Sequence, residues 1–124
     1  MQLAKQPVPQ VNENDVERVV RRDFPADDYD AVMTILDMYG TEAWQRECAR
    51  VQLAALKLAN SSLERLRSCI EIAKTDYRDV LSPAEYPAYR KIGWSQIRKL
   101  ATEEQGNIID SDRRQYEEWL NRAL

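Results

Sequence analysis

Hydrophobic positions follow the three-and-four spacing of an amphipathic helix over most of the chain. The most regular stripe lies in the segment SSLERLRSCIEIAKTDYRDVL, where Leu66 and Ile70 are expected to face the core. The segment before it, TEAWQRECARVQLAALKLAN, has a broader apolar face, which is typical of a central helix. Because only about two residues separate these segments, the pattern predicts a central antiparallel helical hairpin over residues 42 to 58 and 62 to 81.

Residues with capping chemistry indicate where the helices start and stop. Asn14, followed by Glu17, predicts the start of a first helix, and Pro25 predicts the start of a second helix that ends at Gly40. Asn60 is expected in the left-handed conformation that ends a helix.

The same signals recur in the second half of the chain. Ser61 opens a capping box for the second helix of the hairpin, and Ser82 before Pro83 predicts the start of a further short helix. Thr102 is expected to cap a final helix over residues 103 to 122. No alternating run of β-branched residues occurs, so the sequence predicts an all-α fold of five or six helices around the central hairpin.

Length and composition indicate one folded domain. The 124 residues are 44% hydrophobic and 31% charged, which is ordinary for a globular protein. Residues 1–11 contain Pro7 and Pro9 without a helical period and are expected to form a flexible tail. Residues 12–124 are then expected to form a single helical domain.

Charge and cysteine usage bear on partners and location. The net charge is -3, and residues 1–40 hold eight acidic and four basic groups, so no general attraction to nucleic acids or anionic membranes is expected. Cys48 and Cys69 occupy apolar positions and are expected to be reduced core residues. Without a signal peptide or a long apolar run, the sequence predicts a cytoplasmic protein.

Few residues are suited to catalysis or to cofactor binding. The chain has no histidine, which excludes histidine-dependent triads and most transition-metal sites, and its three glycines form no phosphate-binding loop. Asp76 and Asp79 have a spacing that could serve a divalent cation, but Arg78 between them favours ion pairs. No catalytic residue, cofactor or metal is therefore predicted.

Basic pairs recur along the chain, as at Arg21–Arg22, Arg90–Lys91 and Arg98–Lys99. Acidic residues lie close to each pair in the sequence, which is typical of a solvated, mixed-charge face. No nucleic-acid partner is therefore expected.

The segment DYRDVLSPAEYPAYRKIGW concentrates aromatic residues around two prolines. Tyrosine and tryptophan combine a large apolar body with a polar tip and therefore serve well at interfaces. A packed corner between helices is the favoured interpretation, and an interaction patch is the second. The residues of that candidate patch are Asp76, Arg78, Asp79, Glu85, Tyr86, Tyr89 and Trp94.

The segments RVQLAALKLA, DYRDVL and AEYP resemble a family of small, uncharacterised, all-helical bacterial proteins, over about residues 19 to 120. The resemblance implies a helical fold and a bacterial cytoplasmic origin, and it assigns no catalytic residue.

Two hypotheses for function stay open at this point. The first is a non-enzymatic protein–protein interaction domain of the immunity, antitoxin or adaptor type. It would bind a protein partner, and the sequence does not determine its oligomeric state. The second is a small-molecule or anion-binding domain, or a carboxylate-dependent enzyme, with a pocket near Asp76 to Tyr89 in which an arginine holds an anion.

Overall fold

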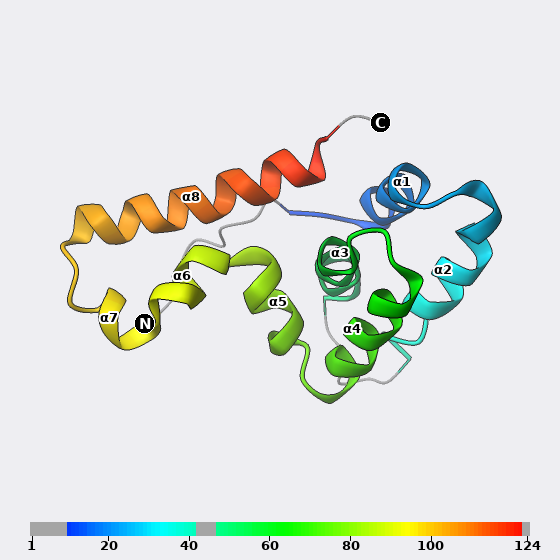
Figure 1. The fold of residues 1–124 in the computed structure, drawn as a ribbon, viewed down its shortest axis with the longest axis horizontal. Helices are drawn as coiled ribbons and strands as arrows, with labels where there is room; N and C mark the ends of the chain where they lie inside the picture. Colours follow the sequence, from blue (N-terminus) through cyan, green and yellow to red (C-terminus); the bar gives the residue numbers. More distant parts are fainter. Residues whose placement is uncertain (1–9, 42–46, 123–124) are drawn as a thin grey trace.

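The computed structural model describes residues 10–41 and 47–122, with the side chain of Trp94 excepted. In these ranges the chain is helical and contains no strand, so the predicted all-α class is confirmed. Figure 1 shows the arrangement of the elements. They are α1 (Glu13–Asp23), the 3-10 helix η1 (Ala26–Asp28), α2 (Tyr29–Leu36), α3 (Cys48–Ala59), α4 (Leu63–Thr75), α5 (Arg78–Glu85), α6 (Pro87–Ile92), α7 (Trp94–Ile97) and α8 (Thr102–Leu120).

The eight α-helices in the described ranges exceed the expected five or six, mainly because the helix predicted over residues 62 to 81 is divided. Asp76 ends α4 in an extended conformation, and its Oδ1 accepts a hydrogen bond of 3.0 Å from the backbone N–H of Arg78 in the first turn of α5. The apolar stripe continues across this break, since Val80 of α5 is buried like Leu66 and Ile70 of α4. Periodicity alone therefore does not reveal the break.

Helix starts also differ from the prediction around Pro83. This residue lies inside α5 and does not begin a new helix, whereas Pro87 occupies the first turn of α6. Of the helix expected over residues 42 to 58, residues 42–46 lie outside the described residues, and α3 begins at Cys48. Residues 1–9 of the expected tail lie outside them as well.

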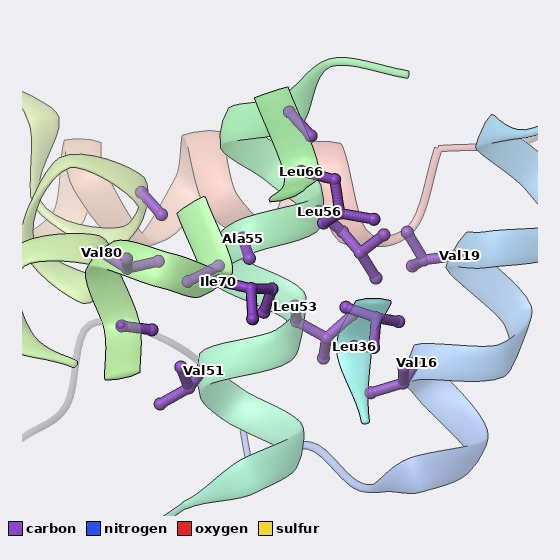
Figure 2. Packing of buried hydrophobic residues seen from close by; sticks show 14 of the residues in the cluster. Val16, Val19, Leu36, Val51, Leu53, Ala55, Leu56, Leu66, Ile70 and Val80 are labelled. Carbon is purple, nitrogen blue, oxygen red and sulfur yellow. The ribbon is translucent and has the colours of Figure 1, made fainter. Parts of the chain in front are cut away.

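The main apolar core is built around α3, which packs against α1, α4 and α5. Figure 2 shows side chains from α1 to α5 converging on this helix. Leu53 on α3 and both Leu66 and Ile70 on α4 are fully buried, which confirms the predicted core positions. Tyr116 and Leu120 near the end of α8 complete the cluster.

One region of the described chain lies outside this core. We call residues 87–99, which comprise α6, α7 and the two residues after them, the α6–α7 arm. Figure 1 shows α6 and α7 beside the first half of α8, at the end of the molecule away from α1 and α2. No described residue from 86 to 115 belongs to the main cluster, and Ile97 of the arm is buried apart from it. The arm therefore depends on its own contacts with α5 and α8.

Local backbone chemistry explains the helix boundaries. Asn60 has φ 49° and ψ 52°, which confirms the predicted left-handed end of α3. Ser61 is also left-handed, so Ser62 caps α4 in its place and accepts a hydrogen bond from the N–H of Arg65. The predicted cap Asn14 is wrong as well. Asn12 caps α1, because its Oδ1 accepts bonds from the N–H groups of residues 14 and 15 while Asp15 reaches back to the Asn12 N–H.

Replacing the observed cap should destabilise the protein more than replacing the expected one. Asn12→Ala removes the side chain that satisfies two backbone donors at the start of α1, and it should lower the free energy of unfolding by about 1 kcal/mol. Asn14→Ala, the matched control, should change it by less than about 0.5 kcal/mol. Urea unfolding followed by circular dichroism measures both. A larger loss for Asn14→Ala would contradict the assignment of the cap.

Candidate functional site

The residues of the predicted patch separate into an exposed and a buried group. Asp76 and Arg78 form an ion pair of 3.0 Å on the surface, which confirms the ion-pair interpretation of these two residues. Hydrogen bonds from Arg78 hold the pKa of the Asp76 carboxyl below its ordinary value. Asp79 is exposed beside them. Because the pair joins residues two apart in the chain, it is a local feature of the turn between α4 and α5.

Glu85 is not part of the displayed patch, because its side chain is 0% exposed. It lies at the end of α5 and faces Arg50 on α3. The Nε and Nη2 of Arg50 donate to the two carboxylate oxygens of Glu85 at 2.8 and 2.6 Å, and its Nη1 donates to Glu47 at 2.7 Å. This bidentate pair ties α5 to α3.

Burial and ion pairing shift the pKa values of Glu85 and Arg50 in opposite directions. Burial raises the pKa of Glu85, and the hydrogen bonds from Arg50 oppose that rise. Burial lowers the pKa of Arg50, but the hydrogen bonds and negative charges of Glu85 and Glu47 together outweigh burial, and the net direction is upward. The geometry fits an ionised carboxylate, since both oxygens accept hydrogen bonds. Glu85 therefore lacks the free, accessible oxygen that the hypothesis of a carboxylate base near Asp76 to Tyr89 requires.

Three tyrosines surround the end of α5. Tyr86 and Tyr89 are half-buried and meet edge to face, with ring centroids 6.5 Å apart. Tyr116 on α8 is fully buried, and its hydroxyl has no hydrogen-bond partner in the described part of the chain. Burial raises the pKa of Tyr86, Tyr89 and Tyr116. The tyrosines thus form the packed corner that the sequence favours, with part of Tyr86 and Tyr89 left accessible.

A second buried carboxylate, Asp112 on α8, fastens the arm. Its Oδ1 accepts a 2.8 Å hydrogen bond from the N–H of Ala88, and its Oδ2 accepts a 3.1 Å bond from the N–H of Tyr89. These amides belong to the first turn of α6, where a negative charge is favourable. Sequence reasoning missed this role, although an acid four residues before the buried Tyr116, within an apolar stripe, is a signal that could have revealed it.

Arginines of α1 hold the end of α8. Arg22 Nη1 donates to the carbonyl oxygens of Trp119 and Leu120 at 2.8 and 3.0 Å, and Arg18 Nη1 donates to that of Leu120 at 2.8 Å. The Arg22 side chain is 5% exposed and paired with Asp23, so the expectation of a solvated face is wrong for this residue. Its position over the Trp119 ring adds a cation–π contact.

An open pocket of about 600 Å³ lies beside the contact between the α1 arginines and the end of α8. Its walls carry arginines from both helix ends, but these arginines already donate to carboxylates and to the carbonyl groups of α8. The pocket therefore accompanies a contact that holds two helices together. Its lining residues are Asn14, Glu17, Arg18, Arg21, Arg22, Asn121 and Arg122.

The basic pairs of the arm behave differently. Arg90, Lys91, Arg98 and Lys99 are all exposed, and none forms an ion pair with a described residue. Their exposure agrees with the expected solvated face, but the acids near them in the sequence do not pair with them. Glu85, the nearest acid before them, is turned inward to Arg50, and Glu103 and Glu104, the nearest after them, are exposed without an ion pair to the arm. Beside Arg90 and Lys91 on α6, Ile92 is 39% exposed. The arm thus displays unpaired cations together with apolar surface.

The described residues form neither a metal-binding cluster nor a membrane-spanning helix. Cysteine, aspartate and glutamate side chains nowhere gather in a group of three suited to a metal ion within residues 10–41 and 47–122. No helix in these ranges combines the length and apolarity needed to cross a bilayer. Cys48 and Cys69 form no disulfide and are half-buried, at the edge of the core.

Removing one partner of the buried pair should strongly destabilise the protein. Glu85→Gln leaves the Arg50 guanidinium without its bidentate partner and should lower the free energy of unfolding by about 3 kcal/mol. Glu117→Gln is the matched control, since its pair with Arg113 is exposed and should contribute less than about 1 kcal/mol. Urea unfolding measures both variants. Equal losses would show that burial of the pair has no energetic consequence.

The contribution of the Asp112 hydrogen bonds to stability can be measured against a second aspartate on the same helix, α8. Asp112→Asn removes the negative charge and one of the two acceptors at the start of α6, and should cost about 1–3 kcal/mol of stability. Asp110→Asn, at an exposed position two residues earlier, should cost less than about 0.5 kcal/mol. Thermal and urea unfolding give both values. The proposed role of Asp112 is wrong if its variant is as stable as the control.

Comparisons of the chain with protein-family models, with curated proteins and with solved structures each gave no match. The resemblance of RVQLAALKLA, DYRDVL and AEYP to small helical bacterial proteins therefore stays a prediction.

Proposed function

We propose that this protein is a non-enzymatic interaction domain that binds a partner protein through the α6–α7 arm. The observation that carries the proposal is the exposed apolar surface of α6, which lies outside the main core. Ile92 is 39% exposed, and Tyr89, three residues earlier on the same helical face, is half-buried. Apolar and aromatic side chains of this kind anchor protein interfaces.

The placement of the buried charged groups supports a binding role over a catalytic one. Glu85 and Asp112 both accept hydrogen bonds that join helices, and the Arg22 guanidinium binds backbone carbonyls. Each of these groups is engaged in holding the fold. The proposal therefore assigns function to the surface of the arm.

Contacts with the rest of the fold keep the arm ordered, which suits a binding surface. Asp112 fixes the first turn of α6, and Ile97 of α7 is 1% exposed. A surface that is already ordered loses less conformational entropy on binding. In this proposal α3 and α4 form the central antiparallel hairpin that supports the arm through α5, and the chain acts in the bacterial cytoplasm as an immunity, antitoxin or adaptor protein.

Matched isoleucine variants test the proposal. Crosslinked partners are captured from cells of the native host with the wild-type chain, with Ile92→Ser in the arm, and with Ile72→Ser on α4, which removes a somewhat more exposed isoleucine elsewhere. The partner is then identified, purified and titrated against all three proteins. Ile92→Ser should raise the Kd at least about tenfold, while Ile72→Ser should leave it unchanged.

Circular dichroism must show that both variants keep the helical content of the wild type. Failure to enrich any protein over a mock capture, or binding that depends on Ile72 and not on Ile92, would overturn the proposal.

A further inference from the structure

We infer that the partner segment bound by the arm is an acidic, partly apolar stretch of protein, whose carboxylates pair with Arg90, Lys91, Arg98 and Lys99. This inference rests on the proposed function and specifies the chemistry of the partner.

Positive charge is concentrated in and next to the arm. Residues 86 to 102 contain these four cations and no aspartate or glutamate, although the whole chain has a net charge of -3. With +4 in this segment, the rest of the chain carries -7. The arm is therefore a local positive region on an otherwise acidic protein.

The cations of the arm form no ion pair within the described fold. All four side chains are exposed and unpaired. Two buried carboxylates beside the arm are engaged elsewhere, since Glu85 binds Arg50 and Asp112 binds the backbone amides of α6. The exposed Glu103 and Glu104, which follow the arm in the sequence, form no ion pair with it. Arg90 and Lys91 lie in the last turn of α6, where a cation is favourable, but that position leaves their charge available to a ligand.

An exposed apolar side chain follows the cations of α6. Ile92 follows Arg90 and Lys91 directly, and Gly93, with φ 92°, turns the chain into α7. Among the large hydrophobic side chains described, Ile92 and Ile72 are the exposed ones. A ligand that matches the arm must therefore offer both negative groups and an apolar side chain.

The surroundings of the arm favour a short acidic protein segment over a long polyanion or an anionic membrane. Glu103, Glu104 and Asp110 are exposed on the first half of α8, the helix against which α6 packs. A nucleic acid or a bilayer surface that extended beyond the arm would meet these acids, and Ile92 offers little to a phosphate backbone. A short peptide segment avoids this repulsion.

Fluorescence anisotropy with defined probes tests the inference. The probes are a labelled peptide of about 12 residues that alternates Glu or Asp with Leu and Phe, the same peptide with Lys in place of the acids, and a single-stranded DNA of similar length. Vesicles containing phosphatidylserine are tested by co-sedimentation. The acidic peptide should bind best, and its affinity should fall at least about tenfold between roughly 50 and 300 mM salt.

Charge-neutral variants locate the site. The variant Arg90→Gln, Lys91→Gln, Arg98→Gln, Lys99→Gln should weaken binding of the acidic peptide at least about tenfold. The control Arg65→Gln, Arg67→Gln, Arg113→Gln, Arg114→Gln makes the same change in net charge at exposed positions on α4 and α8 and should bind like the wild type. Glutamine is used because acids at the end of α6 would weaken that helix.

The inference is overturned if the acidic peptide does not bind at about 1 mM or if both variants lose the same amount of affinity for it. It is also overturned if DNA or vesicles bind the protein more tightly than the acidic peptide does. Its failure differs from failure of the proposed function. A native partner whose binding requires Ile92 but is insensitive to salt and to the four arm cations leaves the protein-binding function standing and refutes the acidic partner.

Discussion

The buried ion pair between Arg50 and Glu85 is the interaction on which the arrangement of the second half of the chain depends. Glu85 is the last residue of α5, and its carboxylate is held by two nitrogen atoms of a side chain on the central helix α3. A buried charge is costly unless its partner supplies such geometry. The pair therefore ties the last residue of α5 to α3, next to the point at which the chain leaves the main core to form the arm.

The same pair links structure to the proposed function. Glu85 on α5 faces inward and α6 and α7 contain no acidic residue, so the arm cations that follow Glu85 have no ion-pair partner there. Asp112 likewise binds the amides of α6, so it secures the arm without neutralising its surface. Arg22 anchors the far end of α8 to α1, which holds the helix that carries Asp112. Three buried charged groups thus hold the helices together, while the cations of the arm stay exposed.

The sequence predicted the helical class and the core of the central helices, because apolar periodicity reports burial directly. Leu66 and Ile70 are examples. It did not predict the break at Asp76, since the stripe continues through it, nor the pairing of Arg50 with Glu85, which lie 35 positions apart. Glu85 instead resembled the third residue of a capping box after Ser82. The unpaired state of the arm cations was likewise hidden, because it depends on how the neighbouring acids are oriented in the fold and not on how near they lie in the sequence.

Site-resolved hydrogen exchange in the native state tests most directly whether the arm is a unit outside the main core. Amides of α3, α4 and α5 should exchange only through global unfolding, whereas those of α6 and α7 should exchange through a separate opening of lower free energy. Uniform protection across α3 to α7, with a single opening free energy for all of them, would contradict the account.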